Sequence, residues 1–247
     1  MDYFMKLLYK TIRLFPLFIV FISISGMINQ GLSQEQRWIR VGDLQCYFYD
    51  YGSELEGDVN FLIWPALYGN NQTTCRGKGL WLGAQNFTDP LADNIVRGVK
   101  VIGIGPRSSV HQDNMFIPQS IKLVGKFEHP DVIVNDKEGS SNPDYDMLDE
   151  FDESLPCDRM VVIKFNTSMG VSVTKKVLAF TQQDHDDYFI YDYVFKNTGI
   201  YNENGDILEQ TLTDFWVYFT YRYAFAGVTS SGWGSTWGAF SLSLIHI

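Results

Sequence analysis

Short runs of aromatic and aliphatic residues alternate with polar residues along most of the chain after Trp38. The segment VSVTKKVLAFTQ at 171–182 places three valines and an alanine on one parity, interrupted by Lys175, and mainly serine, threonine and lysine on the other. A period of two is that of a β-strand with one buried face, whereas a helix repeats every 3.6 residues. We therefore predict a half-buried strand here.

The other apolar runs have the length of strands and are bounded by Gly, Pro, Asn or Asp, which are typical of turns. The two longest are separated by IYNENGD at 200–206, in which Asn204-Gly205 is a strong turn dipeptide. Many strands without helices between them predict an all-β, antiparallel β-sandwich, as one large or two packed subdomains, with few helices beyond the N-terminal segment. The predicted strands are 44–52, 61–65, 79–84, 99–105, 121–127, 158–166, 171–182, 188–199 and 211–227.

Residues 1–33 have the features of a secretory signal peptide. Lys6, Lys10 and Arg13 precede the apolar run 14–28, and small residues permit cleavage after Ser33. The run is shorter than the roughly 20 residues that a membrane-spanning helix needs. An uncleaved N-terminal anchor is the alternative. We predict a secreted or cell-surface protein that meets the membrane only through this segment, during export.

Composition narrows the classes of partner. Hydrophobic residues at 45% and charged residues at 19% describe a packed protein and not a disordered one. The formal net charge is −10, and removal of the signal peptide makes it more negative. Such a field repels phosphate backbones, so we predict that the protein has no nucleic-acid partner.

One segment interrupts the strand pattern. Residues 135–158 are acidic, contain Ser and Pro and are poor in aliphatic side chains, so they predict a long surface loop or linker. This segment separates a β-rich N-terminal part at 34–134 from a β-rich C-terminal part at 159–241. It is a candidate boundary between two sheets or two subdomains.

The last six residues, LSLIHI at 242–247, correspond to a translation of CTG TCT CTT ATA CAC ATC. That DNA resembles the transposase-end adaptor used in sequencing libraries. We therefore predict that these residues are not natural protein sequence and that the natural chain, truncated here, continues past about Phe240. The alternative is an ordinary strand, because FSLSLI alternates in polarity.

The acidic segment contains a candidate calcium site. Asn142, Asp144 and Asp146 alternate like the first oxygen ligands of a calcium loop, and Glu153 falls at its twelfth position. Met147 occupies the sixth position, where such loops need glycine, and no helices flank the segment. Two interpretations stay open: a calcium site made by these four residues, or a solvated acidic loop.

A histidine among three aspartates, DHDD at 184–187, precedes the aromatic strand 188–199. His185 beside carboxylates has the composition of a general base, but neighbouring residues of an extended chain point to opposite faces. No zinc-binding or nucleophile motif accompanies it. We interpret the cluster as the polar turn at which a strand with two largely apolar faces begins, and we assign no catalytic residue.

Three cysteines are present: Cys46, Cys75 and Cys157. An exported chain permits one disulfide, but an odd count leaves one thiol unpaired, and the sequence does not choose the pair. None of the three lies in a motif that activates a thiol, so we predict structural roles.

Tryptophans raise a glycan-binding hypothesis, because exposed aromatic faces stack on sugars. The commoner alternative is burial on a face of the sandwich. The residues concerned are Trp64, Trp81, Trp216, Trp233 and Trp237.

Several long phrases resemble one group of proteins. KGLWLGAQNFTDP, LPCDRMVVIKFNTSMGVSVTKKVLAF, YFIYDYVFKNTG and DFWVYFTYRYAF are similar to sequences of large exported proteins of marine and sediment bacteria. Many of those end in a C-terminal sorting domain of the type IX secretion system, which this sequence lacks. The resemblance covers roughly residues 60–227. It implies a β-rich surface protein that uses a secretion machinery, and it carries over no catalytic residue.

Two classes of function remain. The first, which the sequence favours, is a non-enzymatic surface module of a larger protein that works in adhesion or binds glycans or other cell-surface components. The second is a surface hydrolase of polysaccharides, with a catalytic part downstream or built from scattered Asp and Glu. Calcium, as the one cofactor suggested, fits either class.

Overall fold

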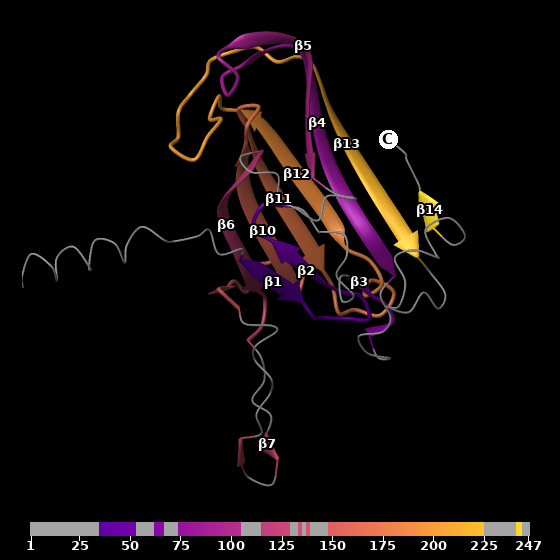
Figure 1. Cartoon of the computed structure of the whole chain (residues 1–247). Coiled ribbons are helices and arrows are strands. Elements are labelled where there is room, and N and C mark those ends of the chain that lie inside the picture. Colours follow the sequence, from indigo (N-terminus) through magenta and orange to yellow (C-terminus); the bar gives the residue numbers. More distant parts are fainter. Residues whose placement is uncertain are drawn as a thin grey trace, which may run out of the picture. The chain divides into compact units, whose positions relative to one another are not determined.

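The computed structural model describes residues 35–52, 62–66, 74–104, 115–128, 133–134, 137–138, 148–224 and 241–243, all within one compact unit. These residues form strands and turns, without an α-helix among them (Figure 1). The all-β prediction is confirmed. The signal peptide at 1–33 lies outside the described residues and stays a prediction.

The larger sheet has five strands in the order β12-β11-β10-β6-β9, and all neighbours are antiparallel except β6 and β9 (Figure 1). The central strands β10 and β11 carry β-branched residues at alternate, buried positions, which suits a pleated, half-buried surface. The strands are β6 (Phe116–Gly125), β9 (Glu150–Phe151), β10 (Arg159–Thr167), β11 (Val171–Ala179) and β12 (Ile190–Asn197).

The second sheet has the antiparallel order β14-β13-β4-β5, and three further strands form the small sheet β1-β2-β3. A short antiparallel pair, β7 with β8, completes the set. The bounds are β1 (Gln36–Ile39), β2 (Gln45–Tyr49), β3 (Leu62–Ile63), β4 (Cys75–Asp89), β5 (Ile95–Ile104), β7 (Ile133–Val134), β8 (Lys137–Glu138), β13 (Thr213–Ala224) and β14 (Ser241–Ser243).

Both larger sheets combine strands from before and after the acidic segment 135–158. β6 pairs with β10 in one sheet, and β4 pairs with β13 in the other. The two β-rich parts of the sequence therefore share sheets. β14 includes the first two of the last six residues and pairs with β13. The pairing does not test whether residues 242–247 come from an adaptor, so that interpretation stays a prediction.

The inner faces of the two larger sheets meet through aromatic rings. On β12 the rings of Tyr191, Tyr193 and Phe195 stack in a row, with centroid distances of 6.4 and 5.9 Å. Across from them, Phe219 of β13 lies 5.0 Å from Tyr193, and Phe215 lies 6.5 Å from Phe195. This contact makes the two sheets the layers of a sandwich. The other face of β12, which includes Ile190 and Val194, is exposed, so only one of its two apolar faces is covered.

Lys175 is the most deeply buried lysine among the described residues. Residues of β11 alternate between buried and half-buried, as the sequence predicts, and Lys175 occupies a buried position with an exposed fraction of 0%. Its ammonium donates to the carbonyl of Gly52 at 3.0 Å and lies over the rings of Phe48, Tyr191 and Tyr193 at 5.2, 5.3 and 5.7 Å. The negative ring faces stabilise the cation, which explains how a charge interrupts the apolar parity.

A buried carboxylate joins β4 to β5. Asp89, whose side chain is 2% exposed, accepts hydrogen bonds from Arg97 Nε at 2.6 Å and Lys100 Nζ at 2.7 Å. Burial acts to raise the pKa of Asp89, but the hydrogen bonds from Lys100 and Arg97 outweigh it and hold the pKa below its usual value. Asp89 therefore stabilises the fold above the pKa of an unfolded aspartate, and this contribution is lost as the pH falls through the lower folded value.

We expect Asp89→Asn to lower the free energy of unfolding at neutral pH by about 2 kcal/mol, because both cations lose a charged acceptor. The measurement is urea denaturation at neutral and acidic pH, where the difference between wild type and variant shrinks once the wild-type carboxylate is protonated. Asp93→Asn, in the exposed turn between the same strands, is the matched control and should leave stability nearly unchanged. A difference that stays constant with pH would contradict this account of Asp89.

Candidate functional site

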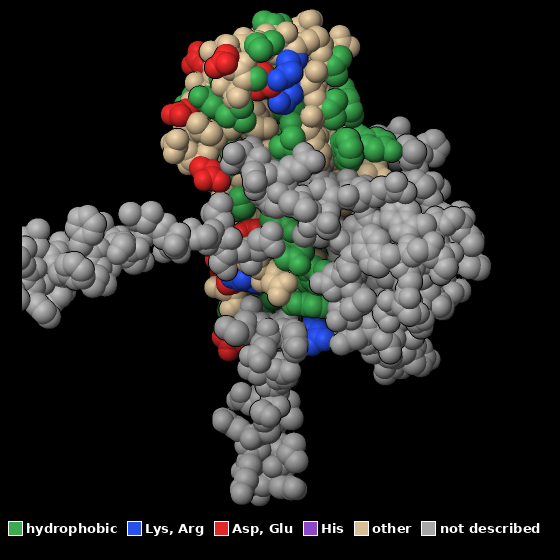
Figure 2. Space-filling view, viewed as in Figure 1, with side chains coloured by type: hydrophobic (Ala, Val, Ile, Leu, Met, Phe, Trp, Pro, Cys, Tyr) green, Lys and Arg blue, Asp and Glu red, His purple; other side chains and the backbone are tan. Residues whose placement is uncertain are grey.

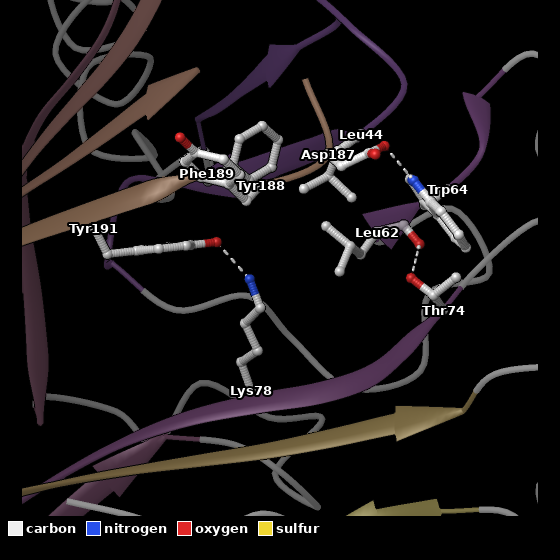
Figure 3. A pocket seen from close by; sticks show the side chains of 9 residues that line it. All are labelled: Leu44, Leu62, Trp64, Thr74, Lys78, Asp187, Tyr188, Phe189 and Tyr191. Carbon is white, nitrogen blue, oxygen red and sulfur yellow. Dashed lines mark hydrogen bonds between the residues drawn. The ribbon is translucent and has the colours of Figure 1, made fainter. Parts of the chain in front are cut away.

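A pocket of about 380 Å³ opens where the small sheet, the start of β4 and the turn before β12 come together (Figure 3). Its size falls within the ~300–1,000 Å³ of pockets that bind small molecules. The lining is mostly apolar and aromatic, with few polar groups, as is usual for ligand sites. The lining residues are Leu44, Leu62, Trp64, Thr74, Lys78, Asp187, Tyr188, Phe189 and Tyr191.

Backbone hydrogen bonds hold the pocket walls together. The amide of Leu44 donates to the carbonyl of Asp186 at 3.2 Å, which fixes the segment before β2 against the turn before β12. Thr74 binds the Leu62 carbonyl through its amide at 2.8 Å and its hydroxyl at 3.3 Å, which fixes the start of β4 to β3. The walls come from distant parts of the chain but are tied directly to one another.

One side of the pocket carries an exposed indole and a carboxylate. Trp64 follows β3 directly and donates from Nε1 to Asp187 Oδ1 at 2.6 Å (Figure 3). This bond satisfies the indole N–H and orients the ring, which remains 40% exposed. Tyr188, next to Asp187, is exposed to a similar degree. This side therefore combines two accessible aromatic rings with a hydrogen-bond acceptor.

The opposite side carries a buried cation. Lys78 of β4 is 6% exposed, and its ammonium donates to the hydroxyl of Tyr191 on β12 (Figure 3). The ammonium also lies 4.7 Å from the ring centroid of Tyr191 and 6.0 Å from that of Tyr221. These contacts hold the lysine chain in one place, so the pocket is positively charged at one end and carries a carboxylate at the other.

The cluster at 184–187 forms an exposed turn, as the sequence predicts. The amide of His185 donates to the carbonyl of Gln182 at 2.9 Å, and Nδ1 of its ring pairs with the hydroxyl of Tyr188. Asp187, by contrast, turns to Trp64. Of this cluster, His185 therefore belongs to the turn, and Asp187 belongs to the wall of the pocket.

The candidate calcium ligands are not brought together by the described part of the chain. Asn142, Asp144 and Asp146 lie outside the described residues, while Glu153 is exposed in the turn after β9. Among the described residues, no three His, Cys, Asp or Glu side chains are grouped closely enough to hold a metal ion. On the face seen in Figure 2, the acidic side chains are dispersed. The calcium site stays a prediction.

The three cysteines are buried thiols. Burial is the main cause that raises the pKa of the Cys157 thiol, so little of the reactive thiolate forms near neutral pH. Its Sγ donates to the carbonyl of Arg159 at 3.2 Å. Cys157 therefore packs as a small apolar side chain, in line with the predicted structural role.

Two of the tryptophans named for the glycan-binding hypothesis lie over glycines and stay partly exposed. Trp81 of β4 lies over Gly103, and Trp216 of β13 lies over Gly83, each on the strand beside it. A Cβ on Gly83 would approach the Trp216 ring to 2.2 Å, so the indole occupies the space a side chain would need. Such pairs stabilise a glycine in a strand. Trp233 and Trp237 lie outside the described residues.

No protein-family model matches the chain, and neither a curated protein nor a solved structure matches it significantly. Within the described residues, no helix is long and apolar enough to span a membrane. The similarity to large exported bacterial proteins therefore stays an expectation from the sequence. The pocket is the feature of the described residues that suggests a function.

Proposed function

We propose that the protein is an exported, non-enzymatic β-sandwich module of the cell surface that binds glycans in the pocket beside Trp64. The observation that carries this proposal is the accessible indole held by Asp187 at the rim of an aromatic-lined cavity. Sugar rings present C–H faces that pack on aromatic rings and hydroxyls that donate to carboxylates. The wall formed by Trp64, Tyr188 and Asp187 offers both kinds of contact.

The lining favours binding over hydrolysis. Most glycoside hydrolases need two carboxylates ~5–9.5 Å apart around the scissile bond. Among the described residues that line the pocket there is one carboxylate, that of Asp187, and it is engaged by Trp64. A hydrolase remains the alternative, with its catalytic carboxylates in another part of the full protein.

Export is the part of the proposal that rests on sequence. The cationic start and short apolar run of residues 1–33 support passage through a secretion machinery. The negative net charge suits a surface protein that stays soluble, and it argues against a nucleic-acid ligand.

We expect Trp64→Ala to weaken glycan binding at least about tenfold, which corresponds to about 1.4 kcal/mol, because the sugar loses its stacking surface. The measurement is an array of plant and algal polysaccharides probed with the protein, followed by titration calorimetry on the best ligand. The matched control is Trp216→Ala, which removes an indole of similar exposure, 43%, from β13, away from the residues that line the pocket. Failure of every polysaccharide to bind, or an equal loss in both variants, would contradict the proposed site.

A further inference from the structure

The charged groups of the pocket indicate which class of sugar it binds. Of the nine described residues that line it, Lys78 is the one cation and Asp187 the one anion, and Figure 3 shows them at opposite ends of the cavity. A ligand that fills this space meets a positive end and a negative end. Its own charge distribution has to match that order.

The positive end holds two donors side by side. The Lys78 ammonium and the Tyr191 hydroxyl are hydrogen-bonded to each other, and they come from β4 and β12, one strand of each larger sheet. An ammonium carries three N–H donors and a phenol carries one O–H. Two adjacent donor groups match the two oxygens of a carboxylate, and hydrogen bonds to a charged acceptor are the stronger kind.

A second cation strengthens this end. The ammonium of Lys175 lies 5.3 Å from the centroid of the Tyr191 ring, and that of Lys78 lies 4.7 Å from it. Both lysines are buried, so their charges are poorly screened by water. The described surroundings of Tyr191 thus hold two cationic side chains, and a carboxylate is the ligand group that complements them.

We propose that the pocket selects sugars that carry a carboxylate, the uronate units of acidic polysaccharides. The carboxylate binds Lys78 and Tyr191, the sugar ring packs on Trp64 and Tyr188, and a ring hydroxyl donates to Asp187. Asp187 also rejects the reverse orientation, because it would face the carboxylate with a like charge. This inference rests on the proposed function and names its ligand class.

The test compares acidic polymers with neutral copies of themselves. Polygalacturonate and alginate are each titrated into the protein by calorimetry, alongside the same polymers after chemical reduction of their carboxyl groups to alcohols. We expect at least one native polymer to bind about tenfold or more tightly than its reduced form. Lys78→Met, which keeps the length and apolar stem of the side chain, should abolish that difference. Lys122→Met, at a lysine of β6 whose side chain is 57% exposed, should preserve it.

The outcomes separate the two proposals. Equal binding of native and reduced polymers, weakened by Trp64→Ala, overturns the uronate inference and leaves glycan binding in place. A sulfated galactan that binds more tightly than both polyuronates also overturns it. If Lys78→Met does not fold, the comparison of native with reduced polymer on the wild-type protein still decides. Absence of binding to any polysaccharide overturns the proposed function itself.

Discussion

Replacing Lys175 by glutamate is expected to lower the free energy of unfolding by about 4 kcal/mol or more, the cost typical of an uncompensated buried charge. The ammonium now faces three aromatic rings and the carbonyl of Gly52. Ring faces and carbonyl oxygens are both negative, so a carboxylate in the same place is repelled by the groups that hold the cation. Domains of this kind are stable by about 5–15 kcal/mol, so a large part of the stability would be lost.

The adjacent lysine provides the control. Lys176→Glu makes the same change of charge one residue later, on the half-buried, outward parity of β11, and should cost less than about 1 kcal/mol. Both variants are compared by urea denaturation followed by tryptophan fluorescence. If the two variants had similar urea midpoints, the aromatic rings around Lys175 would not be stabilising its positive charge, and this account would be wrong.

Gly52→Ala is expected to cost about 3 kcal/mol, because two effects add. Gly52 has a φ of +80°, which costs a residue with a Cβ about 1–2 kcal/mol. The new Cβ would also lie 2.1 Å from Cε1 of Phe165, a ring fixed in the core by contact with Phe116, so the backbone has to shift. Overpacking of that kind typically costs a further 1–3 kcal/mol.

A second glycine isolates the backbone effect. Gly205→Ala changes a residue with nearly the same φ, +79°, that has no atom within 4 Å of a built Cβ, so it should cost only about 1 kcal/mol. Thermal unfolding followed by circular dichroism measures both variants. Equal losses at the two positions would mean that Phe165 yields to the methyl group and that packing contributes nothing.

The period-two pattern predicted the strands well where one face of a strand is buried and the other is wet. Residues 171–182 contain β11, and the turn at 200–206 is closed by the bridge between Ile200 and Ile207. The pattern located only 79–84 of β4, which extends over Cys75–Asp89, because glycines and the left-handed Asn86 resemble turn signals. The pattern did not predict strands β1, β7, β8 and β9, because their two to four residues are too few to show a period.

The pocket was less visible in the sequence than the fold. In DHDD the sequence pattern indicates His185 as the candidate for chemistry, whereas the residue that lines the pocket is Asp187. The partner of Asp187 is Trp64, more than a hundred residues earlier in the chain. Lys78 stands in CRGKGL, which contains no motif. Its proximity to Tyr191 follows from the packing of two sheets, and alternation along one strand does not specify which strand packs opposite.

The pairing of β4 with β13 has a consequence for how the protein is made. Leu80 pairs with Phe219, so this layer of the sandwich stays incomplete until almost the whole described chain has left the ribosome. Contacts between such distant segments form slowly, since the intervening loop has to close first. For the export proposed above this delay is favourable, because the sheet that contains β4 is not complete until β13 has been synthesised.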